Sequence, residues 1–433
     1  MSRCFSCFFG GNILLNYSKR MTQKDEQQRI AGEEACPTVR LREGFTTGAC
    51  AAAAAKAAVL GLLENGKAPL SVRVPFPSGE AIPFQVEWLK REQDSMLAAV
   101  RKDAGDDPDV THGALVVAKV CWCSGSGIRF EAGEGVGRVT KPGLSIPPGE
   151  PAINPGPRAM VTAAIRSVTG KGVCVTLSIP GGEELAQKTF NPRLGIVGGL
   201  SILGTTGRVR PFSCQAIRCS VACELSVAQA AGVTHPVFVP GHIGERSARR
   251  QLKVSDEQLI EVGNEWGFVL EDLARYGFEH VLLWGHPGKL AKLAGEEWDT
   301  HSSRSRSAIE LIREIFQGGA DIPVCGGSGQ GGADILVCGG SDQGGADIDA
   351  SLPCQARALP DTAVSVCASS ALTAEGFFAQ LEEPARTRAA NRLSQVIAEE
   401  AFAKCAGACR VSVALVNLAG DLLGSHGELI KWR

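Results

Sequence analysis

The sequence predicts a mixed α/β fold, with an α+β domain over residues 40–231 and an α/β, Rossmann-like domain over residues 232–433. At roughly 100–200 residues per domain, 433 residues suggest two or three domains. Strands, helices and glycine-rich turns are mixed in the first part of the chain. From Pro236 onward, short apolar strands alternate with helices, which is typical of parallel α/β units.

The first domain is expected to begin with an alanine-rich helix that starts at Ala49 and continues to Leu63. Thr46 and Thr47 precede it and provide an N-cap. The remaining expected strands are Val72–Val74, Pro83–Val86, Met96–Val100, Leu115–Trp122 and Val173–Ile179, and the remaining helices are Arg158–Val168, Glu183–Thr189 and Pro211–Val227.

The second domain is expected to have parallel strands at Val237–Val239 and His280–Trp284. Helices are predicted between them at Glu245–Leu252 and Asp256–Tyr276, the latter capped by Ser255. A helix over Thr387–Lys404 and a hairpin from Arg410 to Leu423 complete the expectation.

Two segments are expected to lie outside the folded domains. Residues 1–39 contain an apolar patch that is too short to span a bilayer, followed by polar residues, and we predict a disordered leader. Residues 317–348 repeat a 13-residue unit, which is too short and too rarely repeated to stack as a solenoid. We predict a flexible surface loop without a function of its own.

Composition limits the class of partner and the cellular location. Lys and Arg total 44 and Asp and Glu total 46, so the net charge of −2 offers no general attraction to nucleic acid or an anionic membrane. The 16 cysteines form no disulfide or zinc framework. They are typical of reduced thiols in a cytoplasmic protein, and we predict no metal site.

A first candidate site is the turn Thr46-Thr47-Gly48. A turn that opens a helix presents backbone N–H groups and the positive end of the helix dipole, which suit a carboxylate or phosphate. A plain N-cap explains the same residues.

A second candidate is the segment Lys102–Thr111, which directly follows an expected strand and contains four carboxylates. Such a loop could hold a cation, supply a base or bond ribose hydroxyls. A solvated acidic turn is the alternative, and the spacing lacks the distal Glu of a calcium loop.

Two glycine-rich segments, 133–158 and 181–207, are further candidates because glycine allows close approach to a ligand. The first contains Lys141 and Arg158, and the second contains Lys188 and Arg193. Tightly packed turns and an ion-paired helix are the alternative interpretation.

Together these segments closely resemble one family, the cobalt-precorrin-5B C1-methyltransferases of the anaerobic route to cobalamin. The resemblance covers residues 40–310 and departs after Ser302, where Ser303-Arg304-Ser305-Arg306 replaces a family lysine and its neighbours. The matching phrases are GFTTGACAAAAAKAA (44–58), KDAGDDPDVTHG (102–113), GVGRVTKPGL (135–144), GEPAINPGPR (149–158), GGEELAQKTFNPRLGIVGGLSILGTTGRVRPFS (181–213), GHIGER (241–246), LLWGHPGKLAKLAG (282–295) and DTHS (299–302).

The resemblance implies methyl transfer from S-adenosyl-L-methionine to carbon C1 of an anionic cobalt-corrinoid, with cobalt arriving only as part of the substrate. Carboxylate arms of such a substrate need cations, and the donor needs hydroxyl acceptors and close backbone. The expected substrate-binding residues are Lys102, Lys141, Arg158, Lys188 and Arg193. The expected donor-binding residues are Thr46, Thr47, Gly48, Asp106, Asp107, Gly204, Thr205 and Thr206.

Asp103, Asp106 and His286 are the expected catalytic residues. His286 follows the strand 280–284, at a carboxyl end where sites of α/β proteins gather. Methyl transfer depends chiefly on orientation, so strong acid–base catalysis is not required.

Two other classes of protein fit the same features. One is a non-catalytic tetrapyrrole carrier, and the other is a small-molecule kinase, which is weakened by the lack of a Gly-Lys-Ser/Thr phosphate loop. Expected partners are the corrinoid substrate, other cobalamin-pathway enzymes and a second copy of the chain, without nucleic acid or membrane.

Overall fold

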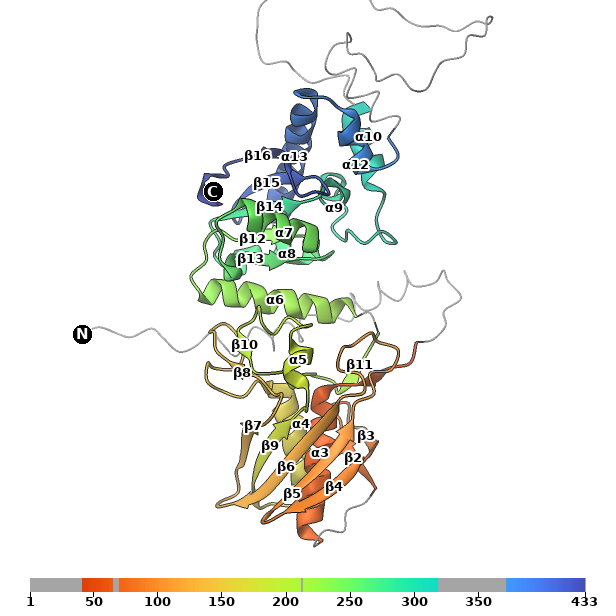
Figure 1. Ribbon diagram of the computed structural model, residues 1–433, viewed down its shortest axis with the longest axis vertical. Coiled ribbons are helices and arrows are strands. Elements are labelled where there is room, and N and C mark those ends of the chain that lie inside the picture. Colours follow the sequence, from red (N-terminus) through yellow and green to blue (C-terminus); the bar gives the residue numbers. More distant parts are fainter. Residues whose placement is uncertain (1–40, 65–69, 212, 318–370, 433) are drawn as a thin grey trace, which may run out of the picture. The chain divides into compact units, whose positions relative to one another are not determined.

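The structure, a computed structural model, describes residues 41–64, 70–211, 213–317 and 371–432 (Figure 1). The expected leader and all but the first residue of the repeat lie outside these residues. The chain divides into two compact units. The first unit contains the chain up to Thr234 together with Ser255–Ile260, and the second unit contains His235–Val254 and the chain from Glu261 onward.

The first unit is built around a five-stranded sheet of order β4-β5-β6-β9-β7. Neighbouring strands from β4 to β9 are antiparallel, and β7 runs parallel to β9. The bounds are Trp88–Glu92 (β4), Ser95–Arg101 (β5), Leu115–Cys123 (β6), Ile128–Ala132 (β7) and Gly172–Ser178 (β9). The three expected strands of this sheet are confirmed, whereas β4 and β7 were not predicted.

Helix α3 (Thr47–Leu63) is the centre of this unit. It contacts β5, β6 and the helix α4 (Pro155–Arg166). The side chains from Ala49 to Ala55 are all buried. Because alanine is small, the sheet and α4 can both approach the helix closely, which explains a helix that is apolar all round. The hairpin β2 (Ser71–Pro75) and β3 (Ala81–Gln85) packs beside it.

Short strand pairs bind the glycine-rich segments of the first unit together. β1 (Gly44–Phe45) pairs with β11 (Arg208–Val209), and β8 (Arg138–Val139) pairs with β10 (Ile196–Val197). The helices α5 (Gly182–Ala186) and α6 (Cys214–Ala230) complete this unit. Segments far apart in sequence therefore share one loop region.

A second five-stranded sheet has the order β13-β12-β14-β15-β16 and belongs to the second unit, except that Leu259 and Ile260 of β13 are grouped with the first unit. β14 (His280–Gly285) runs parallel to both β12 (Val237–Val239) and β15 (Arg410–Val416), and β16 (Leu422–His426) is antiparallel to β15. β13 spans Leu259–Glu261. The expected parallel strands and the expected hairpin are confirmed.

Helices surround this second sheet (Figure 1). α7 contacts β12 and β14, and α13 contacts β15 and β16. Their bounds are His242–Gln251 (α7), Trp266–Asp272 (α8), Pro287–Leu290 (α9), Ala308–Gln317 (α10), Ala374–Gln380 (α12) and Ala385–Lys404 (α13), with 3-10 turns at Asp256–Gln258, Leu273–Arg275, Ala291–Gly295 and Ile430–Trp432.

The single helix predicted over 256–276 is wrong. The segment forms a 3-10 turn, then strand β13, then α8 and a second 3-10 turn. Leu259 and Ile260 are 2% and 1% exposed, because β13 lies beside β12. Ser255 does form a capping box, but it caps only the short turn. Gly263, with φ of +65°, then separates the strand from α8.

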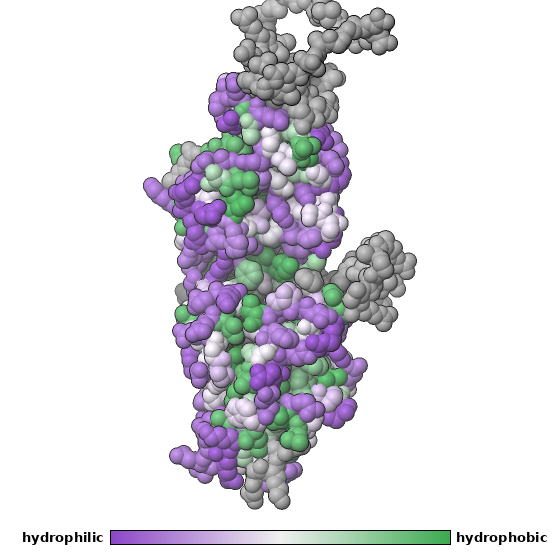
Figure 2. Space-filling model, turned by 45° about the vertical axis from the view of Figure 1, so that its right-hand side comes forward, coloured by the Kyte–Doolittle hydropathy of each residue, from purple (hydrophilic) through white to green (hydrophobic). Residues whose placement is uncertain are grey.

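Hydrophilic residues cover much of the face drawn in Figure 2, and hydrophobic residues appear there as separate patches in both units. Among the described residues, no helix is both long and apolar enough to cross a membrane.

Candidate functional site

The predicted turn Thr46-Thr47-Gly48 binds the loop 203–207 of its own chain. Thr46 caps α3 by accepting from Ala49 N at 3.2 Å, and its own N–H donates to the carbonyl of Gly207 at 3.0 Å. Gly48 N donates to the carbonyl of Leu203, and the Thr47 hydroxyl accepts from Leu203 N at 2.9 Å. The two threonines are 5% and 4% exposed. Most polar groups of the turn are thus used within the protein, and donor binding there stays a prediction.

Gly204 lies against this turn and has φ of +115°. A Cβ at this position would stand 2.4 Å from the Thr46 side chain, so the close approach requires glycine. The neighbouring Thr205 and Thr206 are exposed. The packing explains the glycine. The Thr206 hydroxyl donates to the Arg208 carbonyl and accepts from Arg208 N, both at 3.3 Å, so ligand binding by these threonines stays a prediction.

The acidic loop is fixed to the segment before α3 by Arg42, which sequence reasoning missed. Both terminal nitrogens of Arg42 bind Asp103, with Nη2 2.9 Å from Oδ1. Hydrogen bonds from Arg42 and from the Gly105 N–H lower the pKa of Asp103 to about 2. Asp106 Oδ2 accepts from Arg42 N at 2.6 Å, and Asp106 N donates to the Arg42 carbonyl. Phe45 N also donates to the Asp103 carbonyl at 2.7 Å, so the acidic loop meets the segment directly before the turn Thr46-Thr47-Gly48.

Asp106 and Asp107 differ in exposure. Asp106 is exposed, and Asp107 is half-buried, with its N–H 3.4 Å from the carbonyl of Ala104. Asp106 therefore offers its carboxylate to solvent while its backbone is held in place.

Lys102 and Asp109 form an ion pair of 2.7 Å at the base of the same loop. The Lys102 side chain is 1% exposed, so it has no open path to a large substrate. Burial acts to raise the pKa of Asp109, but hydrogen bonds from Lys102 and Thr111 outweigh it and the pKa is lowered. The geometry gives this lysine a structural contact.

Three of the other predicted substrate-binding residues already face carboxylates. The ion pairs are Lys141 with Glu257 at 2.8 Å, Arg158 with Glu150 at 3.4 Å and Arg193 with Glu224 at 3.9 Å. The hydrogen bond from Lys141 contributes most to a Glu257 pKa of about 2. Lys188 is exposed and forms no ion pair with any residue that the structure describes.

The start of α4 adds another polar group to this end of the first unit. Asn154 stands at the N-cap position, but its side chain makes no capping hydrogen bond. A Cβ on the nearby Gly156 would lie 3.2 Å from the carbonyl oxygen of Gly204, so α4 and the loop 203–207 are in close contact. Asn154 and the exposed threonines thus lie near the starts of both helices. The helix was expected to start at Arg158, and the prolines on either side of Gly156 are a sequence signal for the earlier start at Pro155.

His286 belongs to the second unit, where it directly follows β14 and caps α9. Its Nδ1 accepts from Gly288 N at 3.0 Å, and its Nε2 lies 2.8 Å from a Glu375 carboxylate oxygen. Because Nδ1 is an acceptor, Nε2 carries the ring proton and donates it to Glu375. Sequence reasoning missed Glu375, which follows His286 by 89 positions.

A cavity of about 500 Å³ adjoins His286. Its lining includes Glu375, Ser305 and Lys292. Lys292 is 5% exposed, and its Nζ donates to the Ser305 hydroxyl at 2.7 Å and to the carbonyl of Thr300 at 3.2 Å. A buried ammonium with hydroxyl neighbours is suited to an anionic group.

Comparison with known proteins identifies the family. Residues 34–211 match the profile of the family described as CbiD. A cobalt-precorrin-5B C(1)-methyltransferase of Syntrophotalea carbinolica is 44% identical over 393 residues, which cover 91% of this chain and 99% of the relative. The protein of that name from Thermus thermophilus is 50% identical over 277 residues, or 64% of this chain and 75% of the relative. The chain belongs to the CbiD family of cobalt-precorrin-5B C(1)-methyltransferases.

Among solved structures, the chain is similar to a cobalamin biosynthesis protein from Archaeoglobus fulgidus. The two are 30% identical, the match covers 61% of this chain and 83% of the other, and the TM-score is 0.33.

Proposed function

We propose that this chain transfers a methyl group from S-adenosylmethionine to carbon C1 of cobalt-precorrin-5B, giving cobalt-precorrin-6A in cobalamin biosynthesis. The observation that carries the proposal is 44% identity over 91% of this chain and 99% of a relative named for the reaction. The expected resemblance and this match agree on the same family.

S-adenosylmethionine supplies an electrophilic methyl group bound to a positively charged sulfur. The electron pair of the ring carbon forms the new C–CH₃ bond, and the electrons of the S–CH₃ bond return to sulfur, leaving S-adenosylhomocysteine. The protein's main task is to hold the two reactants in line and to exclude competing reactions. Asp103, Asp106 and His286 are therefore proposed to organise their surroundings, since a proton transfer at the methylated carbon is not required.

We propose that the corrinoid's carboxylates bind at the loop region of the first unit. Lys188 is exposed there, so it can receive an anionic arm directly. Lys141, Arg158 and Arg193 already face carboxylates, and a substrate arm must exchange with those partners to reach them. Lys102 is assigned a structural role because it is buried and paired with Asp109.

The parallel arrangement of β12, β14 and β15 supports a Rossmann-like description of the second unit. We place the reaction in the cytoplasm, together with the other enzymes of the pathway.

The reaction is tested by incubating the purified chain with cobalt-precorrin-5B and S-adenosylmethionine that carries a ¹³C-labelled methyl group. The expected product contains one labelled methyl group, bound to C1, as shown by mass spectrometry and NMR. A carrier would bind the corrinoid without transfer, and a kinase would consume ATP. Either result, without a labelled product, contradicts the proposal.

Substrate binding is tested with Lys188→Gln. Loss of one exposed charge pair is expected to raise KM for the corrinoid about fivefold, on the scale of roughly 1 kcal/mol, without changing kcat. Lys119→Gln is the matched control, because Lys119 lies on β6 and pairs with Glu92. Equal KM values for the two variants would remove Lys188 from the substrate site.

A further inference from the structure

The path of the chain through the second sheet changes direction at β12. From β12 the chain passes through α7 to β13 on one side, and then through α8 to β14 on the other side. In open sheets of this kind, the loops at the carboxyl ends of the two diverging strands separate and leave a crevice where ligands bind. The order therefore places such a crevice beside the carboxyl ends of β12 and β14.

Directly at the ends of β12 and β14, before the loops diverge, glycines allow the two chain segments to pack closely. A Cβ on Gly285 would lie 2.7 Å from the Pro240 side chain, and a Cβ on Gly244 would lie 2.9 Å from the carbonyl oxygen of Trp284. Gly241, with φ of +150°, makes the turn from β12 into α7. Packing therefore explains Gly285 and Gly244. At Gly241, by contrast, a Cβ would meet only the Glu261 Oε1 atom within 4 Å, so the backbone of this turn is open to close approach by a ligand.

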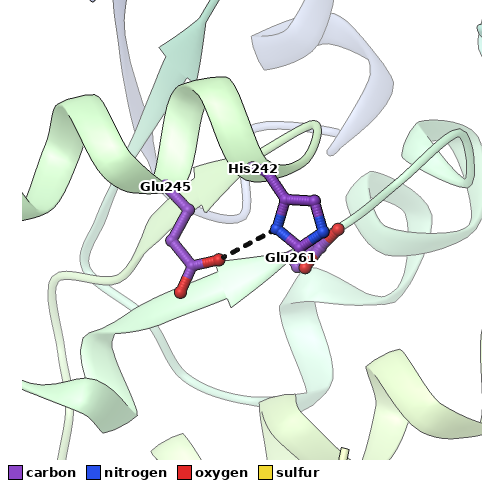
Figure 3. A group of neighbouring side chains, drawn as sticks. All are labelled: His242, Glu245 and Glu261. Carbon is purple, nitrogen blue, oxygen red and sulfur yellow. Dashed lines mark ion pairs between the residues drawn. The ribbon is translucent and has the colours of Figure 1, made fainter. Parts of the chain in front are cut away.

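Glu261 places a carboxylate beside this glycine turn. It is the last residue of β13, and a Cβ on Gly241 would stand 3.6 Å from its Oε1. Figure 3 shows Glu261 next to His242, the first residue of α7. A carboxylate about 20 residues after the glycine turn, at the end of the second strand, is the arrangement that bonds ribose hydroxyls in nucleotide-binding α/β folds.

The cavity beside His286 continues the same edge of the sheet at the end of β14. Its lining includes the buried Lys292 and, from α12, Glu375. Within the residues that the structure describes, no carboxylate forms an ion pair with Lys292, whose Nζ bonds only neutral oxygens. A cation and a carboxylate in one cavity are complementary to the carboxylate and ammonium of an amino acid.

We propose that S-adenosylmethionine binds in this crevice, with its ribose hydroxyls on Glu261 and its amino-acid end in the cavity with Lys292 and Glu375. This inference rests on the proposed function. Strands β13 and β14 are two spacings apart, or about 10 Å, so their ends suit an extended ligand with polar groups at both ends. All residues of this proposed site lie in the second unit. The donor-binding residues expected from the sequence all lie in the first unit.

A divalent cation is the competing occupant of the same side chains. Ligand atoms of His242, Glu245 and Glu261 lie within 4.8 Å of one another. However, Glu245 Oε1 accepts hydrogen bonds from Arg249 at 3.2 Å, and the His242 side chain is 92% exposed. A neighbouring guanidinium opposes a second positive charge, and three partly exposed ligands leave a cation poorly enclosed. The geometry therefore favours the ribose.

The test measures the affinity of the full-length chain for S-adenosylhomocysteine by calorimetry in the presence of EDTA. Glu261→Gln is expected to bind roughly tenfold to hundredfold more weakly, because a hydrogen bond to a charged acceptor is lost. Glu271→Gln is the matched control, since this exposed glutamate on α8 pairs with Lys404 instead. It is expected to bind like the parent.

A second arm changes the ligand, and its first comparison uses the parent alone. The parent is expected to bind the 2′,3′-dideoxy analogue of S-adenosylhomocysteine roughly tenfold to hundredfold more weakly than S-adenosylhomocysteine itself. The analogue is expected to have about the same affinity for Glu261→Gln as for the parent, because it has no ribose hydroxyls for Glu261 to bond. An analogue that binds the parent as tightly as S-adenosylhomocysteine overturns the inference, even if Glu261→Gln does not fold.

The remaining outcomes separate the inference from the proposed function. If the parent and Glu261→Gln bind S-adenosylhomocysteine equally, or if EDTA abolishes binding, the crevice assignment is overturned while methyl transfer by the parent still supports the function. If the parent binds neither S-adenosylmethionine nor S-adenosylhomocysteine and transfers no methyl group, both are overturned.

Discussion

The loop regions of the two units use similar residues for different purposes. In the first unit, the Thr46-Thr47-Gly48 turn and the acidic loop bond mainly to their own chain, through Arg42 and the loop 203–207. In the second unit, Gly241 and Glu261 lie at the ends of β12 and β13, where the chain reverses the direction in which it adds strands to the sheet. A threonine-glycine turn at a helix start is thus explained by packing alone, whereas a glycine turn beside a carboxylate at a strand end is also suited to a ligand.

The largest expected effect is on the stability of the first unit. Lys102→Met leaves the Asp109 carboxylate without its buried partner, and should lower the free energy of unfolding by about 3 kcal/mol. Chemical denaturation measures the loss. Lys102→Met combined with Asp109→Asn should recover part of it. Unchanged stability in the single variant would mean that the acidic loop is not held by this pair and is free to serve a ligand.

A smaller effect is expected from pH, through the Asp103 carboxylate. The pKa of Asp103 in the folded protein is about 2, below the ordinary value of 3.8. The ionised carboxylate therefore stabilises the folded state fully above pH 4, and this stabilisation is lost as the pH falls toward 2. Its side chain is 44% exposed, so solvent screening limits the contribution to less than about 1 kcal/mol.

The measurement compares unfolding of the parent and Asp103→Asn between pH 5 and pH 2. The parent should lose slightly more stability than the variant over this range. An identical pH dependence would show that the contact between Arg42 and Asp103 contributes nothing to folding.

The fold was predicted more completely than the site. An alanine-rich run after a threonine cap located α3, and short apolar runs located β5, β6 and β14, because each of these segments is largely buried. It failed at β13, since three residues are too few for a periodic signal and the strand exists only because it pairs beside β12. That error hid Glu261, which looked like one polar position on a long helix.

The side-chain partners of the candidate site could not be predicted for a related reason. Arg42 reaches Asp103 across 61 positions, and His286 reaches Glu375 across 89. No local pattern marks either contact, because both depend on tertiary packing. His286 was predicted from its position after a strand. It lines the cavity, and its role in the reaction stays a prediction.

The smallest expected effect is that of Asp106→Asn on donor binding. If the donor binds in the second unit, this exposed carboxylate in the first unit is not involved, and affinity for S-adenosylmethionine should stay within about twofold of the parent, well under 1 kcal/mol. Calorimetry under the conditions used for Glu261→Gln gives the comparison. A loss of tenfold or more would return the donor to the site first predicted from the sequence.

The most direct test of the account is to locate the bound donor itself. S-adenosylmethionine with a radioactive methyl group is cross-linked to the full chain by ultraviolet light, and the labelled peptides are identified by mass spectrometry. We predict label in the segments around Gly241, Glu261 and His286, and loss of that label when S-adenosylhomocysteine is present in excess. If the label that excess S-adenosylhomocysteine removes were confined to residues 42–58 or 190–209, the donor site in the second unit would be contradicted.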